Sequence, residues 1–239
     1  MRRFLLVPIV LILACCSCDI PEQKRTGDTS SGSSAETKQI SSSEPTVSEE
    51  QEKQQIIQCF TNYKSAILND RGTEAVRYSD KNTIDYYAQV LQWVLTASRE
   101  EVERLSILDK MQVLIMRLRV PAEQLRTMTA EELLVYSIDQ GMVGKNGAAT
   151  LDPGTVTVDG NFGKMTILSN QKDTGMSYHY NKENGEWKMD LTAVFPQTKV
   201  ALEAMVKQSG MSENNFLFTL IGSTSPKKPT DDLWVPIGK

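Results

Sequence analysis

The spacing of apolar residues changes once along this chain, from a helical period to a strand period, near Asp152. Between residues 50 and 141 apolar side chains recur at the period of about 3.6 residues that places them on one face of a helix. Between residues 152 and 195 they alternate with polar side chains, as in strands with one buried face. Helices followed by a separate group of strands predict an α+β fold, with helices packed on one face of an antiparallel sheet.

Three long helices are expected before this change, over residues 50–68, 83–97 and 105–120. Pro121 ends the third, because proline lacks an amide hydrogen and disrupts a helix interior. Thr129 and Glu132 form a capping box, in which each side chain accepts a hydrogen bond from the other residue's backbone amide. A fourth helix is therefore expected from Thr129 to a stop at Gly141.

About four strands are expected after the change, over residues 155–158, 162–168, 176–180 and 186–195. Asp159-Gly160 and Asn184-Gly185 are tight-turn signals, so the strands should form a twisted antiparallel meander. Alternation directs Tyr178 and Tyr180 toward the helices and His179 toward the opposite face. In the last strand the inward set is Trp187, Met189, Leu191, Ala193 and Phe195.

The first residues have the layout of a secretory signal. Two arginines follow Met1, residues 4–13 are apolar and uncharged, and the small Ala14 precedes Cys15. This apolar run is too short for a membrane-spanning helix, which needs about 20 residues.

Cys15 after Ala14 resembles the lipoprotein box of bacteria, whose cysteine thiol receives lipid and becomes the mature N-terminus. Cys16 and Cys18 remain alternatives for the lipidated residue. The resemblance implies a diacylglycerol group and stable anchoring, since a single acyl chain binds a membrane only marginally. It also implies a lipid-anchored protein of the bacterial cell envelope, either periplasmic or exposed at the surface.

Composition divides the chain into an exported leader, a tether and one folded domain. Residues 1–18 contain the signal and lipoprotein box, and residues 19–50 are rich in serine and glutamate and nearly free of apolar residues. Such a segment buries too little apolar surface to offset the conformational entropy that it would lose on folding, so we expect a disordered tether. The folded domain should cover residues 51–222, with short helices at 199–208 and 212–221. The tail, residues 223–239, ends in an apolar stretch that we expect to dock on its own domain.

The end of the strand region resembles a known fold family. Tyr178-His-Tyr, a polar turn and Gly185-Glu-Trp-Lys-Met-Asp-Leu191 are similar to the last hairpin of NTF2-like domains, also called SnoaL-like or cystatin-like cones. Gly72-Thr-Glu-Ala75 and the helix that carries Tyr86 and Tyr87 resemble the first half of that family. The resemblance covers residues 51–196 and implies a cone-shaped α+β domain, in which residues 99–142 are a helical insertion.

The resemblance also implies where a pocket would lie, between the sheet and the helices. Tyr178 and Tyr180 would face it, together with Tyr87 or its neighbour Tyr86 and with Trp187. Asp85 is the carboxylate nearest to these tyrosines in sequence, and in a dry pocket its pKa would rise so that it could act as a base. The simpler interpretation is that the tyrosines are core aromatics whose hydroxyls lie at the rim.

Two classes of function follow from this. The first is a non-enzymatic accessory or ligand-binding domain, whose partner is an envelope protein or a small apolar ligand. The second is a small isomerase, dehydratase or hydrolase of the SnoaL-like type that uses an Asp/Tyr pair. The family contains both kinds of protein, so the fold alone does not choose between them.

Other chemistries find little support in the composition. The net charge is −4 and basic residues are scattered, which argues against nucleic-acid binding. His179 is the single histidine, so histidine-dependent triads and multi-histidine metal sites are not expected. Cys59 is the single cysteine beyond the leader, and a buried apolar role is expected for it. Neither a cofactor nor a metal ion is predicted.

Replacing Cys15 tests the lipidation site. In cells supplied with a labelled fatty acid, Cys15→Ala should abolish labelling of this protein, because no thiol remains at the position that the lipoprotein box modifies. The control Cys59→Ala should keep its label. Continued labelling of Cys15→Ala would move the site to Cys16 or Cys18.

Overall fold

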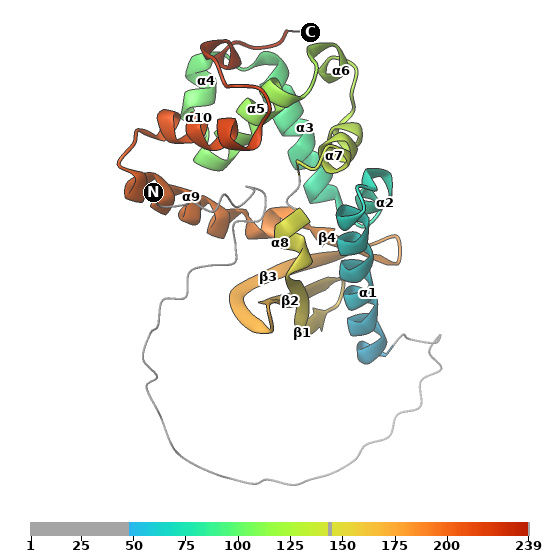
Figure 1. Ribbon diagram of the computed structural model, residues 1–239. Coiled ribbons are helices and arrows are strands. Elements are labelled where there is room, and N and C mark those ends of the chain that lie inside the picture. Colours follow the sequence, from blue (N-terminus) through green and yellow to red (C-terminus); the bar gives the residue numbers. More distant parts are fainter. Residues whose placement is uncertain (1–47, 143–144, 239) are drawn as a thin grey trace, which may run out of the picture.

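The computed structural model describes residues 48–142 and 145–238 (Figure 1). The predicted lipidation site Cys15, its alternatives Cys16 and Cys18, and the tether up to residue 47 lie outside these residues. The four strands and α1 lie at one end of the molecule, and α4, α5, α6 and α10 gather at the other (Figure 1). No helix within the described ranges is long and apolar enough to cross a membrane.

The helices that precede the sheet begin at well-defined caps. They are α1 (Glu49–Leu68), α2 (Gly72–Val76), α3 (Lys81–Thr96), α4 (Arg99–Arg104), α5 (Ile107–Arg119), α6 (Ala122–Leu125), α7 (Ala130–Asp139) and α8 (Lys145–Ala149). The capping box of Thr129 and Glu132 is confirmed at the start of α7. Ser48 with Gln51, and Ser98 with Glu101, form equivalent boxes at α1 and α4. Local side-chain chemistry thus defines where these helices start.

The sheet is an open antiparallel meander in the order β1-β2-β3-β4. Its strands are β1 (Leu151–Asp159), β2 (Phe162–Ser169), β3 (Lys172–Glu183) and β4 (Glu186–Asp190). Met176, Tyr178 and Tyr180 are buried whereas His179 is half-buried on the other face, as their alternation predicts. The predicted α+β class is therefore confirmed.

The prediction for the last strand was too long. The strand ends at Asp190, and the chain continues as a short 3-10 turn, η1 (Leu191–Val194), and then as α9 (Phe195–Ser209). The carboxylate of Asp190 accepts a hydrogen bond from the backbone N–H of Thr192 at 2.8 Å, which turns the chain away from β3. Leu191, Ala193 and Phe195 therefore lie outside the sheet and are only half-buried.

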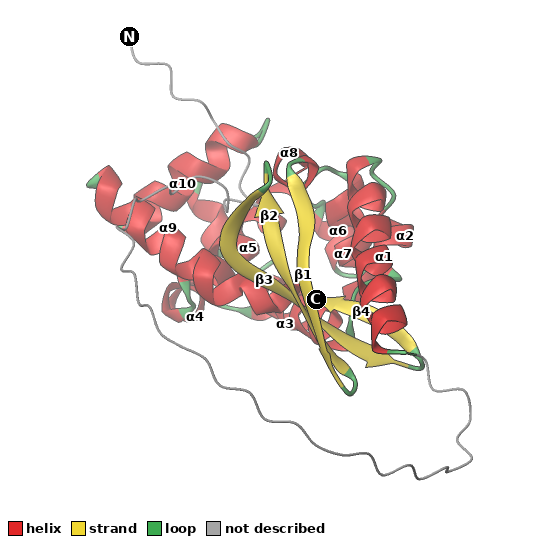
Figure 2. Cartoon of the chain, turned by 90° about the horizontal axis from the view of Figure 1, so that it is seen from below, coloured by secondary structure: helices red, strands yellow, loops and turns green. Residues whose placement is uncertain are grey.

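One side of the core lies between α1 and the inner face of the sheet. α1 contributes Ile56, Phe60, Tyr63 and Ile67, all buried. It approaches β2 closely because Gly163 has no side chain, and a Cβ at that position would lie 2.4 Å from Cδ1 of Ile56. In Figure 2 the strands β1 to β3 lie between α1 on one side and α9 and α10 on the other.

The predicted insertion, residues 99–142, contains the centre of the helical part. α5 is buried on nearly every side, and it contacts α3, α9 and α10 (Glu213–Thr224). The chain ends in a second 3-10 turn, η2 (Asp231–Trp234), with Leu233 and Trp234 buried. The apolar tail thus docks on its own domain, as expected from its composition.

Replacing Gly72 tests the closest helix contact. A Cβ there would lie 2.4 Å from the backbone oxygen of Val135 in α7. Gly72→Ala should lower the free energy of unfolding by about 1–3 kcal/mol, the usual cost of forcing an extra carbon into a packed site. Chemical denaturation measures this change. The exposed neighbour Thr73, changed to alanine, should stay within about 0.5 kcal/mol, and an equal loss in both variants would contradict the packing argument.

Candidate functional site

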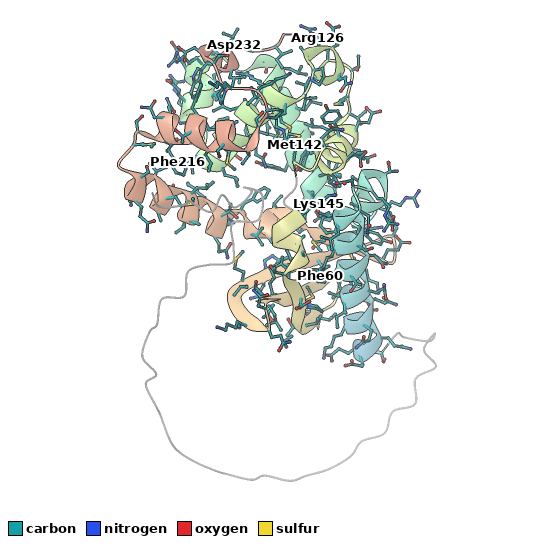
Figure 3. All side chains as sticks on the ribbon, viewed as in Figure 1. Phe60, Arg126, Met142, Lys145, Phe216 and Asp232 are labelled. Atoms are coloured by element: carbon teal, nitrogen blue, oxygen red, sulfur yellow. The ribbon has the colours of Figure 1, made fainter. Side chains whose placement is uncertain are left out.

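Four tyrosines from three elements meet in the core between the sheet and the helices. We call Tyr63 of α1, Tyr87 of α3, and Tyr178 and Tyr180 of β3 the tyrosine cluster; none is more than 7% exposed. The ring of Tyr178 lies 6.1 Å from that of Phe60, which is labelled in Figure 3. Tyr63 lies close enough to Tyr87 and Tyr178 for their phenols to affect its pKa, and Tyr178 affects that of Tyr180 in the same way. The structure therefore brings together the three tyrosines of the candidate pocket and adds a fourth, Tyr63.

Burial dominates the electrostatics of the cluster. It raises the pKa of Tyr87 to about 12 and raises the pKa of Tyr63, Tyr178 and Tyr180 as well. For Tyr63 the nearby phenols of Tyr87 and Tyr178 add to this effect. All four phenols are therefore neutral at physiological pH, able to donate a hydrogen bond but poor as bases.

The hydroxyls of the cluster make few contacts with polar groups. Tyr180 donates to Sδ of Met165 over 3.9 Å, a weak interaction. The hydroxyls of Tyr63, Tyr87 and Tyr178 form no hydrogen bond with another residue that the structure describes. The side chains of these three tyrosines thus serve mainly as core aromatics.

Asp85 does not join the cluster, contrary to the sequence-based prediction. It lies on the exposed side of α3 and pairs with Lys81, one turn earlier in the same helix. Residues two positions apart on a helix differ by about 200° in direction, so Asp85 and Tyr87 cannot share a face. Tyr86 also points elsewhere, and its hydroxyl donates to Asp109 of α5 at 3.0 Å.

Trp187 is buried against the first turns of α1. Its indole N–H donates to Glu52 at 2.5 Å, and Lys182 both pairs with Glu52 at 2.5 Å and lies over the indole ring. The hydrogen bond from Lys182 is the main reason why the pKa of Glu52 is lowered. Trp187 thus joins the β3–β4 hairpin to α1, and its polar contacts are with Glu52 and Lys182.

Two buried carboxylates escaped the sequence analysis. Asp80 accepts hydrogen bonds from the backbone of Thr83 at 2.9 Å and from Asn181 at 2.8 Å. Asp190 accepts from Asn82 at 3.1 Å and from Thr192. Burial raises the pKa of Asp80, and nearby Asp190 adds to this. The signal for Asp80 was present, because an aspartate directly before an amphipathic helix is a typical N-cap.

Cys59 lies beside the tyrosine cluster and is 5% exposed. Burial raises the pKa of its thiol to about 12, so the nucleophilic thiolate is scarce at neutral pH. A shallow surface groove of about 300 Å³ lies between α1 and the β3–β4 hairpin. Cys59 and Trp187 line it, together with polar residues that include Gln55, Gln58, Asn62 and Lys188. The described residues contain no group of histidine, cysteine and carboxylate side chains suited to a metal ion.

No protein-family model matches this chain, and no curated protein or solved structure was found to be similar to it.

The burial of Tyr87 and Cys59 predicts alkaline sensitivity. Their pKa values rise to about 12 from ordinary values of 10.0 and 9.0, so the unfolded chain releases these protons first. Their contribution to stability is complete below pH 9 and is lost as pH rises to about 12. In the unmodified chain the free energy of unfolding should therefore fall as pH rises from 10 to 12. In Tyr87→Phe this fall should be less steep, by up to about 1.4 kcal/mol per pH unit.

Denaturant titrations across this pH range measure the slope. Phe60→Leu is the control, because it weakens the same core without removing a titrating group and should leave the slope unchanged. If Tyr87→Phe does not change the slope of unfolding free energy against pH, the phenol of Tyr87 has the same pKa in the folded and unfolded chains, which would contradict the prediction.

Proposed function

We propose that this protein is a lipid-anchored accessory domain of the bacterial envelope that binds another envelope protein and catalyses no reaction. The N-terminal resemblance to a lipoprotein box, with Cys15 as the acceptor, supports the anchor. The interior of the domain supports the absence of catalysis.

The observation that carries this proposal is that, among the described residues, no carboxylate forms a hydrogen bond with a phenol of the tyrosine cluster. Tyr86, which binds Asp109, lies outside this cluster. Acid–base chemistry on a small substrate needs a base within hydrogen-bonding distance of the reacting proton. Asp85 is exposed and paired with Lys81, while Asp80 and Asp190 serve as caps of α3 and η1. The neutral phenols of the cluster cannot replace these carboxylates as a base. The SnoaL-like enzyme alternative therefore loses its proposed Asp/Tyr pair.

The NTF2-like relationship is part of the same proposal. The order of elements supports it, since α1 to α3 precede a four-stranded meander whose inner face packs on α1. The position of Tyr87, Tyr178 and Tyr180 between the helices and the sheet also agrees with the expected location of the family's pocket. In this chain large side chains occupy that location, with Tyr180, Met165 and Met189 at 0% exposure.

The outer face of the sheet is the surface that we propose for the partner. Thr157, Lys164 and His179 stand opposite one another across β1 to β3, with Thr157 and Lys164 exposed and His179 half-buried. Next to this row Phe162 is 42% exposed, and its ring lies 5.2 Å from that of His179. An exposed aromatic side chain among polar neighbours is typical of the anchors of protein interfaces.

Photo-crosslinking in the envelope tests this proposal. A photoreactive amino acid in place of Phe162, in the full lipidated chain, should yield a covalent adduct with one protein of defined mass. Lys164→Glu in the same chain should reduce the yield of this adduct, because it reverses a charge on the proposed surface.

The matched control carries the photoreactive residue at Glu123, which is exposed on α6 at the end of the molecule opposite the strands (Figure 1). It should give no adduct of that mass. The same adduct from both positions, or none from Phe162, would contradict the proposed surface.

A further inference from the structure

The last residues of the chain are held through their backbone, as a bound peptide would be. We call residues 233–238 the C-terminal strap. Ile237 and Gly238 donate their amides to the oxygens of Val94 and Leu95 at 3.4 and 3.0 Å. Arg126 donates to the oxygens of Ile237 and Gly238 at 3.1 and 3.3 Å. Figure 3 shows Arg126 at the same end of the molecule as Asp232, just before the strap.

One aromatic side chain anchors the strap. Trp234 is 2% exposed and stacks on Phe218 of α10 with 5.7 Å between the rings. The guanidinium of Arg99 lies over the same ring at 5.3 Å. The next residue, Val235, is 61% exposed. Leu233, just before Trp234, is 5% exposed. Backbone recognition combined with a buried tryptophan is typical of peptide ligands.

Arg117 of α5 links the strap to the end of α3. Its guanidinium donates to the oxygens of Trp93, Val94 and Ala97 at 2.7–3.1 Å, and to that of Leu233 at 3.0 Å. Burial lowers its pKa to about 10, so it remains charged at neutral pH. The negative end of the α3 dipole and the carbonyls of its last turn favour this cation. Only one of these four contacts involves the strap, so the other three hold Arg117 in place without it.

A short linker connects the strap segment to the domain. Residues 225–230, between α10 and η2, form neither helix nor strand and contain Pro226 and Pro229. An extended chain of this length reaches about 20 Å. The strap can therefore leave its position while α10 stays in place.

We propose that the strap is an intramolecular peptide ligand, and that its site accepts the strap of a second copy once the chain's own strap is displaced. The strap site consists of the α3 carbonyls, Arg99, Arg117, Arg126 and Phe218. The strap of a second copy is the expected occupant because the chain's own strap fits this site, and every copy carries the same strap. Two copies that exchange straps form a closed pair through contacts that already exist within one chain. This inference is independent of the partner proposed for the sheet.

A labelled peptide tests whether the strap is separable. The probe is a fluorescent peptide of residues 230–238, and the proteins are the full chain and its Trp234→Ala variant in detergent. A tethered strap has an effective concentration on the order of mM, so the unmodified chain should exclude micromolar probe. Trp234→Ala frees the site and should bind the probe at least tenfold more tightly. Val235→Ala, at the exposed neighbour, should behave as the unmodified chain.

Complementation tests the second copy. Trp234→Ala has an intact strap site and a defective strap. Phe218→Ala has a defective strap site and an intact strap. Light scattering after gel filtration should show monomers for each variant alone and a one-to-one pair for the mixture. A mixture that stays monomeric would overturn the exchange. A folded Trp234→Ala variant that does not bind the probe, or a variant that unfolds by circular dichroism, would show that the strap is not a separable ligand.

Discussion

The pairing of residues 78–80 with β4 is the contact on which the arrangement of the whole molecule depends. Met189 donates its amide to the oxygen of Tyr78 at 2.7 Å, and Asp80 donates its amide to the oxygen of Met189 at 3.0 Å. The carboxylate of Asp80 then caps α3 through Thr83. Because Asp80 is bound to the sheet and also begins α3, the position of the helical part relative to the sheet is defined at this point.

The attachment of α3 to the sheet at Asp80 determines what each end of this helix contacts. In its first half, α3 brings Tyr87 close to Tyr63 of α1, which completes the tyrosine cluster. At its other end, the carbonyls at residues 93–97 accept hydrogen bonds from Arg117 and from the C-terminal strap. An arginine without a carboxylate partner is tolerated there because several carbonyl dipoles replace the water that it loses. A single helix thus connects a closed interior with a site that recognises a peptide.

Features that depend on neighbouring residues were predictable. The capping box of Thr129 and Glu132 involves two residues three positions apart, and it forms as expected. The alternation of Tyr178, His179 and Tyr180 also survives, since a strand has only two faces. The prediction was wrong where alternation continued past the strand. Apolar residues at 191, 193 and 195 fit the pattern, but Asp190 binds the backbone of Thr192 and ends the strand.

The sequence by itself determined the order of the longer helices and the four strands, and the buried face of each strand, but not the short helices α2, α4, α6 and α8. These properties come from hydrogen bonds and periodicity within a few residues. Only the tertiary structure decided which tyrosines meet, that Asp85 stays in solvent, and that the last residues dock beside Arg117. Those outcomes depend on contacts between residues far apart in the chain, such as Arg117 with Leu233, and no local pattern encodes them.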